Sequence, residues 1–141
     1  MKPSIYAYLL IKDFEQLQLK SYRCPAGVWT IGYGHTKGVT RNMSITPQQA
    51  EEYLRQDVSH FELELATHHL DLTQCQYDAV ISLMFNIGAD AFARSTLLRK
   101  LKANPNDPTI ADEFRRWIYA SGKPLEGLKK RREQEIKLYY S

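Results

Sequence analysis

Apolar residues recur at a helical spacing along most of the chain, and one early stretch departs from this pattern. Residues 5–17 predict an amphipathic helix, because apolar side chains follow the helical period there: Leu9, Leu10, Phe14 and Leu17. In residues 19–36 the stretches LKSYR and VWTIGY are rich in β-forming residues, and CPAG between them is typical of a turn. A β-hairpin is therefore expected over residues 19–36.

A capping motif predicts where the next helix begins. Thr46 precedes Pro47, which fits the first helical position, and Gln49 can complete a capping box with Thr46. This helix is expected to run to about Leu65, after which THHLDLT breaks the pattern.

Four further helices are expected. A second capping box, Thr73 to Gln76, opens the largely apolar stretch QCQYDAVISLMFNIG, which Gly88 can end. The others are expected at residues 95–103, from Pro108 to near Gly122, and at about residues 125–139.

This order of elements predicts an α+β fold that is mostly helical. We expect one domain, 1–141, with a small N-terminal lobe that carries the hairpin and a helical lobe. The small lobe and a long connecting helix are expected over about residues 12–60. The helical lobe is expected to contain about residues 61–141 together with the N-terminal helix. A cleft between two such lobes is a common place for a ligand.

Composition and charge narrow the function classes. The chain has 141 residues, of which 43% are hydrophobic and 25% charged, and this excludes the disordered classes. The net charge is +3, yet residues 115–137 hold eight Lys/Arg against three Glu. Such a segment either favours an anionic polymer, such as nucleic acid, anionic lipid or bacterial cell wall, or is a solvated helix face.

The two cysteines and the N-terminus add two expectations. Cys24 and Cys75 form no CxxC motif and no zinc site, which favours a reducing compartment. The first residues, MKPSIYAYLLIKDFE, show no small-residue cleavage site, so no signal peptide is expected. No apolar run is long enough to span a membrane.

The glycine-rich stretch CPAGVWTIGYGHT is not a phosphate loop. Its glycines give GxGxxxG with no following helix, and the Walker pattern is absent. Just before it, Glu15 closes the first helix beside the apolar Phe14. A carboxyl group against apolar packing holds its proton to a higher pH, which suits a general acid.

These residues carry a resemblance. Phe14-Glu15, Tyr22, Gly27 and TIGYGHT at 30–36 resemble the motif of the phage-type lysozymes, the endolysins of glycoside hydrolase family 24 that include the T-even phage enzymes. FNIGADAFARSTLLRKL at 85–101 and WIYASGKPLEGLKKRREQE at 117–135 resemble two later segments of that family, in the same order. The resemblance implies the lysozyme-like fold and covers about residue 5 to the C-terminus.

The family's catalytic pattern is E-x8-D-x5-T, which falls here on Glu15, Cys24 and Thr30. The resemblance implies that Glu15 protonates the glycosidic oxygen and that Thr30 helps to hold the attacking water. Cys24 stands where the family has Asp, and a thiol is mostly neutral at neutral pH. Either Cys24 works in place of Asp, aided by the adjacent Arg23, or Glu15 and a Thr30-held water suffice, or activity is lost and wall binding remains.

Other residues of these motifs are candidates for supporting roles. The resemblance places Asn86 in the cleft, and Phe85, Ser95 and Tyr33 are candidates for substrate contacts, although Ser95 also suits an N-cap and Tyr33 packing. An arginine of the last helix, expected to be Arg131, pairs with Glu15 or Asp13. His35 is expected to be tied to a carboxylate, with Asp71 and Asp78 as possible partners.

The implied activity is that of a muramidase, which cleaves the β-1,4 bond between N-acetylmuramic acid and N-acetylglucosamine in bacterial peptidoglycan. The resemblance implies a monomer that stays in the host cytoplasm until lysis and reaches the wall when a partner, such as a holin, opens the membrane. No metal or other cofactor is expected, since acid–base chemistry on a glycoside needs none. Two other classes stay open: a non-catalytic peptidoglycan-binding protein and, more remotely, a nucleic-acid-binding helical protein.

Overall fold

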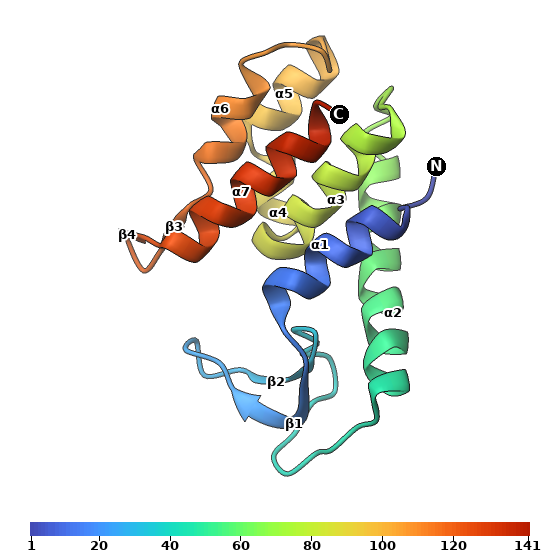
Figure 1. The fold of residues 1–141 in the computed structure, drawn as a ribbon, viewed down its shortest axis with the longest axis vertical. Coiled ribbons are helices and arrows are strands. Elements are labelled where there is room, and N and C mark those ends of the chain that lie inside the picture. Colours follow the sequence, from blue (N-terminus) through green and yellow to red (C-terminus); the bar gives the residue numbers. More distant parts are fainter.

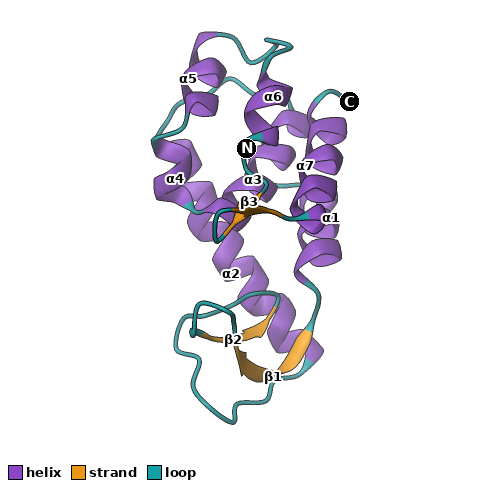
Figure 2. Cartoon of the chain, turned by 90° about the vertical axis from the view of Figure 1, so that its left-hand side faces the viewer, coloured by secondary structure: helices purple, strands orange, loops and turns teal.

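The helices gather in one lobe, and a β-hairpin with its loops forms a smaller second lobe (Figure 1). The structure is a computed structural model that describes residues 1–141. The long helix α2 (Pro47–Ala66) runs alongside both lobes, and both chain ends lie at the helical lobe (Figures 1 and 2). This confirms the expected α+β class with two lobes joined by a long helix.

The small lobe contains β1 (Gln18–Arg23) and β2 (Trp29–Gly32). The helical lobe contains the remaining elements: α1 (Ile5–Glu15), α3 (Gln74–Ile87), α4 (Ala89–Ala93), α5 (Thr96–Ala103), α6 (Ile110–Arg115), β3 (Tyr119–Ala120), β4 (Lys123–Pro124) and α7 (Glu126–Tyr139). No helix is both long and apolar enough to cross a membrane.

Both predicted capping boxes are present. The Thr46 hydroxyl accepts from the Gln49 N–H at the start of α2, and the Gln49 side chain accepts from the Thr46 N–H. Thr73 and Gln76 make the same exchange at the start of α3. Each box satisfies two backbone donors that a helix end leaves free, which explains why the sequence predicts these boundaries well.

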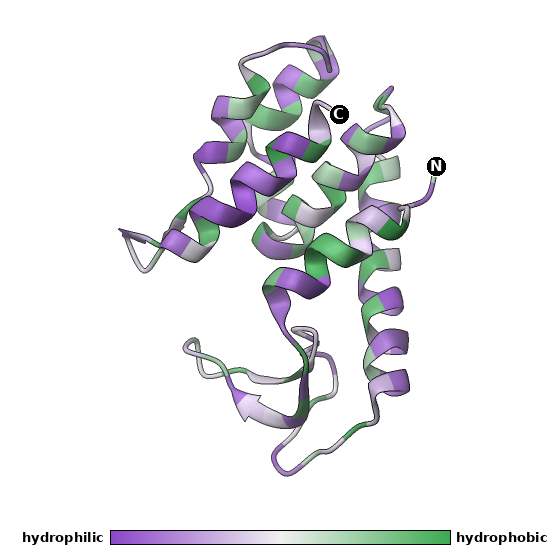
Figure 3. Cartoon of the chain, viewed as in Figure 1, coloured by the Kyte–Doolittle hydropathy of each residue, from purple (hydrophilic) through white to green (hydrophobic).

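The core surrounds α3, whose residues from Gln76 to Met84 are all buried. The helices α1, α2 and α7 pack against it. Apolar side chains make most of this core, but α7 is largely hydrophilic along its length (Figure 3). Three charged residues of α7 are buried where it meets the core: Arg131, Arg132 and Glu135.

The hairpin has the expected position. Its strands are antiparallel, with Tyr22 opposite Thr30 and Arg23 opposite Trp29. The turn is closed by a hydrogen bond of 2.8 Å from the Gly27 N–H to the Cys24 carbonyl. The hairpin therefore holds Cys24 at the beginning of the turn and Thr30 on the returning strand.

Some of the helices differ from the sequence-based expectations. In α1 the buried positions are Ala7 and Ile11, whereas Leu9 is 53% exposed and Leu17 lies beyond the helix. The helix ends at Glu15 because Gln16 takes a left-handed backbone angle, with φ at 52°. The short helix α4 was not expected at all.

The helix expected from Pro108 to near Gly122 is shorter than predicted. It begins at Ile110, after the Asp107 carboxylate accepts from the Thr109 N–H, and it ends at Arg115. The chain then forms the small hairpin β3–β4, whose turn holds Ser121 and Gly122 at φ of 51° and 77°. A helix cannot continue through two left-handed residues.

Gly88 offers a test of the predicted helix end. Its φ of 91° and ψ of 156° are accessible essentially only to glycine, and no atom lies within 4 Å of the place of a Cβ. Gly88→Ala should therefore lower the free energy of unfolding by about 1–3 kcal/mol through backbone strain alone. Chemical denaturation measures this change. Gly127→Ala, a helical glycine with equally open space, is the matched control and should not destabilise the protein.

Candidate active site

Glu15 is held at the end of α1 by the last helix. Arg131 Nη1 donates to Glu15 Oε2 at 2.5 Å, and the guanidinium also lies over the Phe14 ring, 5.8 Å from its centroid. The Arg131 side chain is 3% exposed and that of Glu15 is 21% exposed. The structure thus brings together Glu15 and the arginine that the resemblance implied, and the partner is Glu15 rather than Asp13.

The hairpin lobe closes against Glu15 at Gly34. The backbone at Gly34 has a φ of 78°, and a Cβ there would lie 3.0 Å from Glu15 Oε1 and 4.0 Å from the Phe85 ring. Glycine therefore permits a close approach of the hairpin lobe to the carboxyl group. This contact joins the TIGYG stretch, the end of α1 and the end of α3.

Cys24 lies opposite Val28 at the hairpin turn, where its N–H donates to the Val28 carbonyl at 3.0 Å. Hydrogen bonding by backbone groups, first at Val28 and then at Ala26 and Gly27, lowers the pKa of the Cys24 thiol against an opposing effect of burial. Arg23, which the sequence suggested as the cause, is not among the groups that lower this pKa. Its guanidinium instead lies over the Trp29 ring at 5.9 Å.

Tyr22 lies within electrostatic reach of both candidate catalytic groups. Burial raises the pKa of its phenol, and the charges of Glu15 and Cys24 raise it further. Thr30, directly opposite Tyr22 in the hairpin, is buried and donates from its hydroxyl to the Val28 carbonyl at 3.0 Å. Tyr22, which the sequence did not indicate, therefore lies near Cys24 and opposite Thr30 and is affected by the charge of Glu15.

Three pockets lie near Glu15 or share residues with the pocket that it lines. One, of about 490 Å³, has Gly34, His35 and Phe85 among its lining residues. A second pocket, also of about 490 Å³, has Phe14, Glu15, Asn86 and Arg131 in its lining. A third pocket, of about 640 Å³, lies beside Trp117 and Tyr119. It shares Asn86, Leu125 and Leu128 with the second pocket. The hollow surface thus extends past Glu15 from the hairpin lobe toward β3.

His35 pairs with Asp57, so the two expected partners were wrong. Its Nδ1 lies 2.8 Å from Asp57 Oδ2, and its ring stacks on Tyr53 with 4.3 Å between centroids. Asp78 is occupied elsewhere, since it accepts from Ser4 and Gln74, and Asp71 is exposed. The true partner lies on α2, and no local motif links it to the hairpin.

Two of the four expected substrate contacts line the hollow surface. Asn86 is exposed and its Oδ1 accepts from Arg132 Nη2 at 2.6 Å, which leaves the amide N–H groups free to donate. Phe85 lines the pocket beside Gly34. Tyr33 is half-buried, packs against the core, and has Lys12 Nζ 5.7 Å from its ring centroid.

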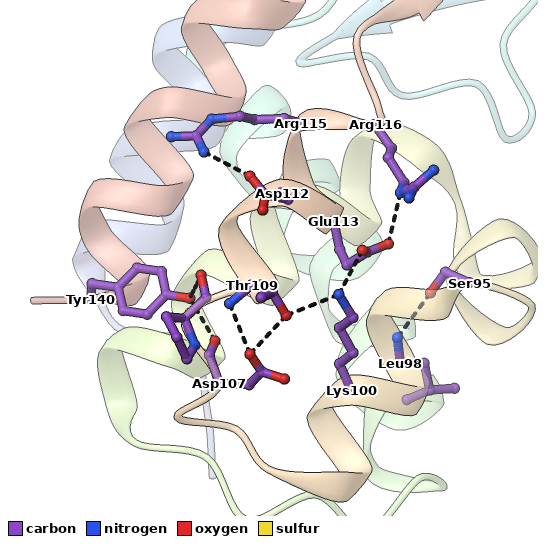
Figure 4. A network of polar contacts seen from close by, with 11 residues as sticks. Ser95, Leu98, Lys100, Asp107, Thr109, Asp112, Glu113, Arg115, Arg116 and Tyr140 are labelled. Carbon is purple, nitrogen blue, oxygen red and sulfur yellow. Dashed lines mark hydrogen bonds and ion pairs between the residues drawn. The ribbon is translucent and has the colours of Figure 1, made fainter.

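Ser95 has a different place. It is buried at the start of α5, where its hydroxyl accepts from the Leu98 N–H at 3.1 Å and donates to the Phe92 carbonyl at 2.7 Å (Figure 4). The hydroxyl is therefore used for capping, the other role that the sequence suggested, and this corrects the expectation of a substrate contact.

The basic segment from Arg115 to Lys137 is less basic at the surface than its composition indicates. Arg115 pairs with Asp112 and Glu133, and Arg116 pairs with the buried Glu113 (Figure 4). Arg131 and Arg132 are buried, and Lys129 pairs with Glu126. The cations left without an ion pair in this segment are Lys123, Lys130 and Lys137. This arrangement removes the main reason to expect a nucleic-acid partner.

No group of three or more histidine, cysteine, aspartate or glutamate side chains is arranged to hold a metal ion.

Comparisons with known proteins agree with this geometry. The family model described as phage lysozyme matches residues 12–135. The chain is 48% identical over 138 residues to the endolysin of Acyrthosiphon pisum secondary endosymbiont phage 1, covering 94% of each protein.

Two solved structures are also similar along nearly the whole chain. The muramidase domain of SpmX from Asticaccaulis excentricus has a TM-score of 0.90 at 33% identity, covering 99% of this chain and 98% of that domain. A mutant of P22 lysozyme has a TM-score of 0.85 at 37% identity, covering 100% of this chain and 99% of that one. The chain therefore belongs to the phage lysozyme family and is a glycoside hydrolase of the lysozyme type.

Proposed function

We propose that this protein is a muramidase of the endolysin type, which hydrolyses the β-1,4 bond between N-acetylmuramic acid and N-acetylglucosamine in bacterial peptidoglycan. The observation that carries the proposal is the position of Glu15, which lines a pocket together with Arg131 and lies close to Gly34, a residue of the neighbouring pocket. A partly exposed carboxyl group in a pocket suits the protonation of a glycosidic oxygen, and the further pockets nearby suit a polymer.

In this mechanism Glu15 is the general acid. Its carboxyl proton moves to the glycosidic oxygen as the bond to the anomeric carbon breaks, and positive charge develops on the sugar that remains. Arg131 holds the carboxyl group in place, and an adjacent cation also favours its ionised form. Proton donation therefore depends on how strongly Arg131 binds Glu15.

Cys24 is the proposed partner of Glu15. Glycosidases commonly use a second ionised group to activate water or to attack the anomeric carbon. The hydrogen bonds that lower the pKa of the Cys24 thiol favour a thiolate in this position. A thiolate that activates water, held with the help of Thr30, gives inversion, whereas a thiolate that attacks carbon gives retention.

The route to the substrate is part of the proposal. A monomer made in the host cytoplasm reaches the wall when a partner such as a holin opens the membrane. A second function, a peptidoglycan-binding protein without activity, is favoured by one observation, the presence of Cys24 where the family has Asp.

Glu15→Gln should lower the rate of sacculus hydrolysis at least about 100-fold, because an amide cannot supply the proton. Purified sacculi are incubated with each protein, and mass spectrometry counts the soluble fragments with reducing muramic-acid ends. Asp13→Asn, which alters a neighbouring exposed carboxylate on the same helix, is the control and should keep its activity. Binding of the wild type to sacculi without release of fragments would instead support the inactive wall-binding protein.

Substitution of Cys24 separates the interpretations of its role. If Cys24 is the working partner, Cys24→Ala should lose activity about 100-fold, whereas Cys24→Asp should retain it within about 10-fold, because both wild type and this variant present an anion. Cys75→Ser is the matched control. Unchanged activity of Cys24→Ala would show that Glu15 and a water held by Thr30 are sufficient.

The ionisation of Cys24 can be measured directly. Because its pKa is lowered, the thiolate is present at lower pH, so alkylation by iodoacetamide should reach half its maximal rate below the value of about 8.5 typical of a free thiol. Peptide mass spectrometry follows Cys24 and Cys75 in the same sample. A half-maximal pH for Cys24 at or above about 8.5 would contradict the proposed thiolate.

A further inference from the structure

Three charged side chains of α7 form a buried cluster behind the site. Glu135 and Arg132 are completely buried, and Arg131 is 2% exposed. Glu135 Oε1 lies 2.9 Å from Arg132 Nε, and Glu135 Oε2 lies 3.4 Å from Arg131 Nε. The same Oε2 accepts from the Ser82 hydroxyl of α3 at 2.6 Å. One carboxylate is therefore shared by two guanidinium groups.

Each of these guanidinium groups also reaches a residue of the cleft. Arg131 Nη1 donates to Glu15 at 2.5 Å, while its Nη2 donates to the Ser82 carbonyl at 3.1 Å. Arg132 Nη2 donates to Asn86 Oδ1 at 2.6 Å. Glu135 itself touches neither Glu15 nor Asn86, yet it contacts both arginines that hold them.

We propose that Glu135 is a positioning residue that sets, through Arg131 and Arg132, how readily Glu15 keeps its proton. The inference rests on the proposed function, since it assigns a purpose to the protonation of Glu15. Because Glu135 shares its negative charge with both arginines, it competes with Glu15 for Arg131 and limits the positive charge that Glu15 meets.

The charges of the cluster show the direction of the effect. Two guanidinium groups face the carboxyl groups of Glu135 and Glu15, so loss of the Glu135 charge leaves more positive charge beside Glu15 and favours its ionised form. Loss of Arg132 has the opposite effect, because Glu135 then binds Arg131 alone. Burial lowers the pKa of Arg132 only to about 10, so it is charged at neutral pH.

The other titratable groups near Glu15 lie outside this cluster. Tyr22 and Cys24 lie on the hairpin side, and Glu126 lines the pocket that contains Glu15. Burial raises the pKa of Glu135, and the charges of Arg132 and Arg131 and the Ser82 hydroxyl oppose that shift. The two guanidinium groups that contact Glu135, at 2.9 and 3.4 Å, are the groups in the cluster that favour its ionised form.

The test measures the protonation of Glu15 in three variants of the whole chain. Carbon-13 NMR of the labelled carboxyl group gives the pH at which Glu15 is half-ionised. In Glu135→Gln this midpoint should fall by about half to one pH unit, and in Arg132→Gln it should rise by a similar amount. The double variant, which restores the charge balance, should return close to the wild type.

Activity gives a second readout. At neutral pH Glu135→Gln should lower kcat about 3- to 10-fold, as the protonated fraction of Glu15 falls, while KM stays near the wild-type value. A merely structural role would lower the melting temperature without moving the midpoint in opposite directions in the two single variants.

Glu113→Gln is the matched control for removal of a buried carboxylate. Glu113 is 3% exposed and pairs with Lys100 at 2.8 Å and Arg116 at 2.9 Å, in the helical lobe away from Glu15 (Figure 4). Its substitution should destabilise the protein to a similar degree and leave the Glu15 midpoint unchanged.

The results can refute the role of Glu135 and the muramidase proposal separately. If the wild type hydrolyses sacculi through Glu15 but neither single variant moves the midpoint, or both move it the same way, the role of Glu135 is refuted and the muramidase proposal stands. If the wild type releases no fragments, the muramidase proposal fails, whatever the midpoints show. Should Glu135→Gln not fold, Arg132→Gln and the double variant still decide the direction of the effect.

Discussion

The buried ion cluster of α7 is the constraint on which the site depends. Charged side chains are almost never fully buried without partners, because their desolvation is costly. Here Glu135 forms ion pairs with Arg131 and Arg132, and Ser82 of α3 contributes its hydroxyl to Glu135 and its carbonyl to Arg131, although Arg132 Nη1 is left without a hydrogen-bond partner. The hydrophilic helix α7 can therefore pack against the apolar α3, and this packing places Arg131 beside Glu15.

The same constraint joins distant parts of the chain at the carboxyl group of Glu15. Glu15 is near the N-terminus and Arg131 is 116 positions later, yet their ion pair fixes the end of α1 against α7. Gly34 brings the hairpin lobe close to the same carboxyl group. The two lobes thus meet at Glu15, the residue that the proposed mechanism uses as the general acid.

Local signals in the sequence predicted the elements that depend on local interactions. They did not predict contacts between segments that are distant in the sequence. The capping boxes at Thr46 and Thr73 involve residues three positions apart, so the starts of α2 and α3 were predicted correctly. Asp57 and His35 are separated by 22 positions and meet only because α2 passes beside the hairpin. The composition of the last helix suggested an exposed basic surface, but packing buries two of its arginines and pairs others. The ion pair between α1 and α7 came from the resemblance, because nothing in either segment alone indicates the other.

Cys24 shows how the backbone can compensate for a change of side chain. An aspartate in this position is ionised at neutral pH without assistance, whereas a thiol is mostly neutral. Backbone groups of the turn that begins at Cys24, at Val28, Ala26 and Gly27, lower the pKa of the thiol and favour the thiolate. The conformation of the CPAG turn therefore moves the thiol toward the ionised state that an aspartate reaches without assistance.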